Sequence, residues 1–208
     1  MIPVEALIPF ALASLLLALA PGPDNLFVLT QSALSGRPAG LAVTLGLCTG
    51  LLVHTSAVAL GVAAIFQVSA LAFTLLKLVG AGYLLYLAWM AWRAGASPVP
   101  PGEGRALELG KLYRRGIVMN VTNPKVSIFF LAFLPQFADP ARGPLWLQIV
   151  LLGAVFIGAT IVVFGAVACL AGSLGQWLGR SPRVQLIMNR MAGMVFLGLA
   201  LKLATARR

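Results

Sequence analysis

Cysteine, histidine and acidic residues are all scarce in this sequence of 208 residues. It contains two cysteines, one histidine and five Asp and Glu residues together, and both cysteines, Cys48 and Cys169, lie inside apolar stretches. Two separated cysteines provide neither a disulfide framework nor a metal-ligand cluster. The sequence also has no nucleophile beside a base and no glycine-rich phosphate loop. The composition therefore predicts no enzyme, no metal and no cofactor.

Charged residues are rare as well. They make up 10% of the chain, whereas a soluble domain has about 25%. Hydrophobic residues make up 60%, and the mean hydropathy is +0.97. The net charge of +10 does not indicate a nucleic-acid partner, because the Lys and Arg residues separate apolar runs instead of forming one basic patch. We therefore expect the chain to be surrounded by membrane lipid.

The apolar runs predict an all-α membrane protein. At about 20 residues per span, the chain has room for roughly six transmembrane helices with short loops. The expected spans cover residues 6–34, 39–65, 69–92, 116–137, 145–172 and 184–206. Residues 1–208 would then form a single transmembrane domain, in which a first three-helix repeat (1–93), a cytoplasmic linker (94–112) and a second three-helix repeat (113–208) follow one another.

Three spans in each half turn the second half upside down relative to the first, so we expect two inverted repeats. The loop charges predict the orientation, because cytoplasmic loops carry more Lys and Arg. One side would carry Arg37, Arg93, Arg105, Lys111, Arg114, Arg115, Arg180 and Arg183, and the other side Arg142, Arg207 and Arg208. The first side should be cytoplasmic, which leaves both termini outside.

Prolines interrupt the first span of each half. Pro21, Gly22 and Pro23 break the first span, and Pro124 breaks the fourth. A proline leaves a main-chain carbonyl without its helical donor, and in lipid that carbonyl must face protein or a water-filled cavity. Two equivalent breaks therefore predict a shared cavity, although each could also be a structural kink.

An ionisable residue follows each break. Asp24 comes directly after Pro23, and Lys125 directly after Pro124. Opposite charges at membrane depth suit a small zwitterionic solute, with its ammonium group toward Asp24 and its carboxylate toward Lys125. In the empty protein we expect these two residues to pair with each other. The alternative is that both lie at the membrane interface and reach into the headgroups.

Further polar residues lie near the breaks. Asn120 and Asn123 add amide groups beside Lys125, where they would bind substrate or satisfy the broken helix. His54 lies well inside the second span, and an imidazole can carry a proton near neutral pH. Asp24 and His54 are thus candidates for a proton relay, while a hydrogen-bonded packing role for His54 stays open.

Several motifs resemble the LysE/RhtB translocators, the lysine and homoserine/threonine exporter family. They are PGPDN at 21–25, GRPAG at 36–40, GLLVHT at 50–55, LKLVGAGYLLYL at 76–87, NPK at 123–125 and FLAFLPQF at 130–137. The resemblance spans nearly the whole chain and is loosest in the last span. It implies a bacterial inner-membrane exporter of amino acids or their derivatives, commonly thought to be driven by the proton gradient, with Asn25 among the substrate-binding residues.

Other interpretations remain open at this point. A membrane thiol-disulfide electron carrier would use one cysteine per half, here Cys48 and Cys169, but neither cysteine has the electropositive, accessible setting of a reactive thiol. A non-transporting scaffold would have no use for paired charges in broken helices. The substrate is not specified beyond a weak preference for neutral or small hydrophobic amino acids, and a homodimer is one arrangement that the sequence leaves open.

Overall fold

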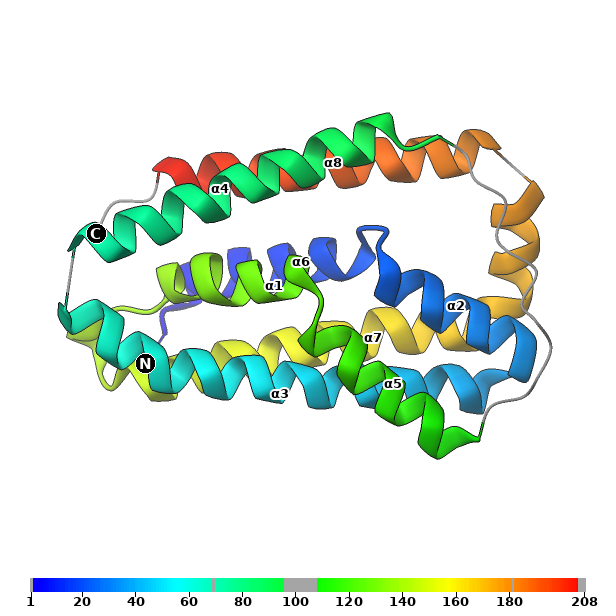
Figure 1. Cartoon of the computed structure of the whole chain (residues 1–208), viewed down its shortest axis with the longest axis horizontal. Helices are drawn as coiled ribbons and strands as arrows, with labels where there is room; N and C mark the ends of the chain where they lie inside the picture. The colour runs from blue at the N-terminus through cyan, green and yellow to red at the C-terminus, as the bar shows by residue number, and fades with distance from the viewer. Residues whose placement is uncertain (1, 69, 96–107, 181, 206–208) are drawn as a thin grey trace.

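The computed structural model describes residues 2–68, 70–95, 108–180 and 182–205, and every regular element in these ranges is a helix (Figure 1). The α-helices are α1 (Val4–Leu19), α2 (Pro23–Ser35), α3 (Arg37–Val68), α4 (Ala70–Arg93), α5 (Leu109–Val121), α6 (Pro124–Ile128), α7 (Leu145–Arg180) and α8 (Pro182–Thr205). Between α6 and α7 lie a π-helical turn, η1 (Phe129–Phe133), and two 3₁₀ turns, η2 (Leu134–Phe137) and η3 (Pro140–Arg142). The all-α prediction is therefore confirmed.

Several helices are long and apolar enough to cross a membrane. Among the described residues, three single helices qualify, over Arg37–Gly61, Leu145–Ala171 and Gln185–Thr205. Two bent pairs qualify when each pair is taken as one span: α1 with α2, and α5 with α6 continued to Phe137. Length and composition thus support three to five spans, and α4 is in neither group. Six spans and an inverted repeat stay predictions, as does the linker, of which residues 96–107 lie outside the described part.

The helices pack in pairs that join the two halves of the chain. In Figure 1, α4 runs beside α8 along one edge of the bundle, and α3 runs beside α7 along the opposite edge. Helices α1 and α6 lie between these two layers, and α5 crosses α3. Large apolar side chains such as Leu60, Val79 and Val162 point outward with 65% or more of their surface exposed. Such an apolar exterior fits a lipid environment.

Glycines bring the main chains of α3 and α5 together. A Cβ atom on Gly46 would overlap the carbonyl oxygen of Tyr113, and one on Gly116 would lie 2.6 Å from the carbonyl oxygen of Val43. Small residues at helix contacts are the usual means of close packing within membranes. Because α5 leads directly into the second break, this contact positions Asn120 and the residues that follow it against α3.

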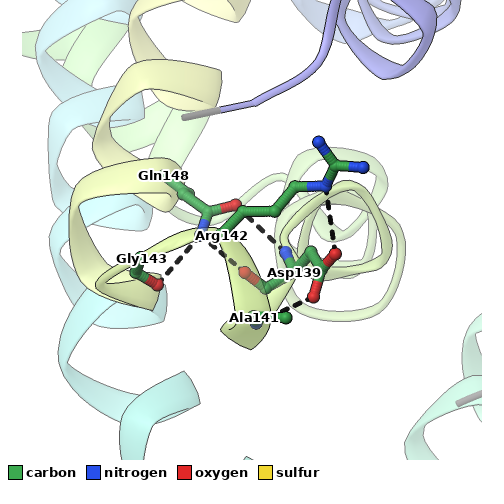
Figure 2. Close-up of polar contacts among 5 residues, drawn as sticks. All are labelled: Asp139, Ala141, Arg142, Gly143 and Gln148. Carbon is green, nitrogen blue, oxygen red and sulfur yellow. Dashed lines mark hydrogen bonds and ion pairs between the residues drawn. The ribbon is translucent and has the colours of Figure 1, made fainter.

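The connection between η2 and α7 is held by one buried glutamine. Gln148 donates from Nε2 to the main-chain oxygens of Asp139, at 2.8 Å, and Gly143, at 3.1 Å, while its Oε1 accepts from the Asp139 N–H at 3.0 Å (Figure 2). The Asp139 carboxylate in turn accepts from the Ala141 N–H and from Arg142 Nε. These bonds fix the start of α7 relative to η2.

Candidate functional site

The two helix breaks have the same local construction. The chain bends by 58° between α1 and α2 and by 50° between α5 and α6. Pro23 is the first residue of α2 and Pro124 the first of α6, a position where a proline is tolerated because the first helical N–H groups have no helical partner. Asp24 and Lys125 consequently occupy the same second position of the two helices that follow the breaks.

Lys125 is buried and reaches across to the end of α1. Its ammonium group donates to the carbonyl oxygens of Leu17 and Ala20, each at 3.1 Å, and only 7% of the residue is exposed. The Leu17 carbonyl would ordinarily accept from the N–H four residues later, but that residue is Pro21, which has no N–H. Pro21 thus creates the acceptor that Lys125 uses.

Asn25 serves the same helix end. Its Nδ2 donates to the Ala18 carbonyl at 2.7 Å, so that Asn25 and Lys125 together satisfy three of the last carbonyls before the break. These carbonyls are among those that any α-helix leaves without an intrahelical donor. Asn25, which the family resemblance placed among the substrate-binding residues, therefore also stabilises the broken helix.

Asp24 is buried, with 3% of its surface exposed, but it does not form the expected direct pair with Lys125. These two described residues are not joined by an ion pair within 4.0 Å, because the Lys125 ammonium is held by the α1 carbonyls instead. Lys125 and His54 still act on the Asp24 carboxylate through their charges, and the side chains of Asn123 and Asn120 act on it at hydrogen-bonding range. The two charges thus share one buried site without touching.

Several buried polar atoms around the breaks have no hydrogen-bond partner among the residues that the structure describes. They are Asp24 Oδ1, Asn25 Oδ1, Asn120 Oδ1 and Asn123 Nδ2. A buried polar group without a partner costs about 1 to 3 kcal/mol, so such groups usually have a partner or a function. Three acceptors and one donor from the two breaks are the complement of a ligand that has an ammonium group and an acceptor oxygen.

The two asparagines of the second break have different roles. Asn123 caps α6, since its Oδ1 accepts from the Lys125 N–H at 3.0 Å. The main-chain oxygen of Asn120 lies 3.1 Å from His54 Nε2. The Asn120 side chain packs directly against Gly50, where a Cβ atom would lie only 2.7 Å from Asn120 Oδ1. Helix α3 therefore supports this break through His54 and Gly50. Neither Gly50 nor the carbonyls at the end of α1 were predicted to be part of the site from the sequence, although Pro21 was the signal for these carbonyls.

The two cysteines are not joined in a disulfide. Cys48 is buried in α3 and Cys169 is exposed on α7, and both are free thiols. Within the described ranges there is no group of three or more His, Cys, Asp and Glu side chains that could hold a metal ion.

Comparison with known proteins decides the family. The model of the LysE type translocator family matches residues 15–207. The chain belongs to this family. Consistent with the predictions from sequence, a LysE type translocator is a multi-pass membrane protein and not an enzyme.

This LysE type translocator is similar to several curated proteins along its whole length. A homoserine/homoserine lactone efflux protein of Salmonella typhimurium is 34% identical over 198 residues, which cover 95% of each chain. An uncharacterized membrane protein of Vibrio cholerae is 33% identical, covering 98% of each chain. A leucine efflux protein of Salmonella typhimurium is 24% identical, covering 94% of this chain and 93% of its own. No solved structure matches this chain.

Proposed function

We propose that this translocator is a secondary transporter that exports amino acids or their derivatives across the bacterial inner membrane. Its similarity to a homoserine/homoserine lactone efflux protein and to a leucine efflux protein supports this class of substrate. Homoserine and leucine, which these names include, each have one ammonium group, one carboxylate and an uncharged side chain. The site of this chain has one buried carboxylate, Asp24, and one buried ammonium group, Lys125, which also suits a neutral amino acid.

The observation that carries the proposal is the equivalence of Asp24 and Lys125. Both side chains are buried, and each follows the proline that starts the second helix of a bent pair. Ionisable groups at membrane depth are costly and are usually retained for transport or proton transfer. We assign the substrate ammonium group to Asp24 and the α1 carbonyls, and the substrate carboxylate to Lys125. Asn25, Asn120 and Asn123 contribute the unpartnered amide atoms that surround these charges.

The fold that we propose for transport consists of six spans in two inverted three-helix repeats. The two bent pairs hold equivalent places in the two halves, and the packing of α3 on α7 and of α4 on α8 joins equivalent helices. Both features support this arrangement. In such folds the substrate binds near the membrane midplane where broken helices meet. The loop charges support a cytoplasmic position for the connection between the halves.

We further propose that export is coupled to protons through Asp24 and His54. His54 acts electrostatically on Asp24, and its Nε2 contacts the Asn120 carbonyl oxygen, which places it beside the second break. A carboxylate that alternates between a proton and a substrate ammonium group would exchange one for the other on opposite sides of the membrane.

Purified protein in proteoliposomes would test this function. Vesicles loaded with radiolabelled homoserine or leucine should lose label faster than protein-free vesicles, and an imposed proton gradient should accelerate the loss. Asp24→Asn should abolish the acceleration. Lys111→Met, which changes an exposed lysine on α5 outside the site, should have no effect. Equal rates with and without protein for both amino acids would contradict amino-acid export, and a normal response in Asp24→Asn would contradict the role of Asp24.

A further inference from the structure

We propose that the Lys125 ammonium group is a built-in counter-ion, which occupies the substrate ammonium position in the empty transporter and leaves it when substrate binds. This inference rests on the proposed amino-acid export and adds to it a role for Lys125 in the return of the empty protein. It follows from where the structure places the ammonium group, which is on the main chain of α1 and not on Asp24.

The position that Lys125 occupies is chemically a general ammonium site. The carbonyl oxygens of Leu17 and Ala20 accept at 3.1 Å each; Leu17 lies in the last turn of the 16-residue helix α1, and Ala20 is its C-cap residue. The C-terminal end of a helix carries partial negative charge and stabilises cations. These acceptors are main-chain atoms that recognise an ammonium group and nothing else about its side chain, so a substrate ammonium group satisfies them as well as Lys125 does.

The unpartnered Asp24 carboxylate oxygen gives the substrate an advantage at this position. Among the described residues, Asp24 Oδ1 has no hydrogen-bond partner while Lys125 is bound to the carbonyls, although the charge of Lys125 and the side chains of Asn123 and Asn120 act on the Asp24 carboxylate as a whole. An ammonium group has three donors, and Lys125 uses two of them on the two carbonyls. A free substrate is not tethered to α6 and can direct its third donor toward Asp24.

The displaced Lys125 has a new partner in the same event. Its flexible stem lets the ammonium group turn toward the carboxylate of the substrate. The zwitterion brings one positive and one negative charge, so the net charge of the buried site is the same before and after binding. Neither state contains an uncompensated charge, which would be strongly destabilising in this setting.

This exchange predicts a specific defect when Lys125 is removed. The empty site would then contain α1 carbonyls without a donor and, whenever Asp24 holds no proton, a carboxylate without a counter-ion, so the empty protein should reorient slowly. Exchange of internal for external substrate does not require the empty protein to reorient, so it should be spared when substrate is saturating. A purely structural role for Lys125 would reduce both activities together.

Gly22 offers a second variant that keeps the charge. A Cβ atom on Gly22 would lie 3.3 Å from Lys125 Nζ, close enough to crowd the ammonium group on its carbonyls. Gly22 has an extended backbone, with φ of −172°, which alanine also adopts. Gly22→Ala should therefore weaken the binding of the Lys125 ammonium group to the Leu17 and Ala20 carbonyls without removing any polar group.

The experiment compares net efflux and exchange in proteoliposomes loaded with radiolabelled homoserine, with external buffer that either lacks substrate or contains saturating unlabelled homoserine. We expect the ratio of net efflux to exchange to fall roughly tenfold or more in Lys125→Met. The ratio should fall less in Gly22→Ala and stay unchanged in Lys111→Met. Monodisperse elution in detergent verifies the fold of each variant.

An unchanged ratio in both Lys125→Met and Gly22→Ala, or parallel loss of both activities in both variants, would overturn the proposal. If Lys125→Met is not monodisperse, the ratio in Gly22→Ala alone decides the result. The wild-type protein separates this inference from the proposed function: absence of any homoserine or leucine transport by it would contradict amino-acid export itself.

Discussion

The Lys125 ammonium group on α6 donates to the carbonyl of Ala20, the C-cap residue of α1, at 3.1 Å, across a separation of 105 residues. This bond joins the two helix breaks, one from each half of the chain. It also shows how a buried lysine is stabilised without direct contact with a carboxylate, since the free carbonyls of a helix end take the place of an anion. Stability and transport should therefore depend on the two breaks together.

Combined substitution of Asp24 and Lys125 should reveal their electrostatic coupling. Asp24→Asn and Lys125→Ala should each lower stability, because each leaves one buried charge without compensation. The double variant should be more stable than the sum of the single effects predicts, by about 1 to 3 kcal/mol. Thermal unfolding of all four proteins in the same detergent measures this difference. Strictly additive effects would mean that the two side chains lie in separate environments.

Asn25→Ala should destabilise the first break. Its loss leaves the Ala18 carbonyl without the 2.7 Å bond from Asn25 Nδ2, at a cost of about 1 to 3 kcal/mol. The matched control is Asn189→Ala, which removes longer, exposed bonds to Ala94 and Gly95. Thermal unfolding should show the larger shift for Asn25→Ala. If Asn25→Ala instead unfolds like the wild type and only weakens homoserine binding, Asn25 acts in recognition alone.

Gly46→Ala should disturb the contact between α3 and α5. The added methyl group would overlap the main-chain carbonyl of Tyr113, which cannot move without shifting α5, and overpacking of this kind costs about 1 to 3 kcal/mol. Gly61→Ala on the same helix is the control, because a Cβ atom there meets no atom within 4 Å. It should be neutral or slightly stabilising. Similar unfolding temperatures for both variants would contradict close packing at Gly46.

His54→Gln should separate packing from proton transfer. A glutamine amide can reach a main-chain oxygen as His54 Nε2 does with Asn120, but it cannot bind a proton near neutral pH. We expect homoserine efflux to persist while its acceleration by an imposed pH gradient is lost. Efflux at two gradients of opposite direction measures this response. A fully retained gradient response would leave His54 with a packing role only.

Replacing both cysteines tests the electron-carrier alternative. Cys48 is buried and Cys169 exposed, and neither forms a disulfide. The double variant Cys48→Ser with Cys169→Ser should keep its efflux rate, because no step of the proposed export uses a thiol. Efflux from vesicles under reducing and oxidising conditions provides the comparison. Loss of efflux in a monodisperse double variant would revive a role for the thiols.

The local chemistry of the sequence determined the helical class and the positions of the helix breaks. An apolar chain with few charges has to satisfy its main chain within helices when lipid surrounds it. Pro23 and Pro124 predicted where two helices would start, because proline has no N–H to continue the preceding helix.

The partners of the buried polar groups were decided only by the tertiary structure. Sequence alone predicted that Lys125 would pair with Asp24, since opposite charges attract. The folded chain instead brings Lys125 to Leu17 and Ala20, whose carbonyls had lost their donors at the first break. A local pattern identifies which groups lack partners, but the distance between groups about 100 residues apart depends on how the helices pack. That packing places Lys125 on the end of α1 and leaves Asp24 Oδ1 without a hydrogen bond from any residue that the structure describes.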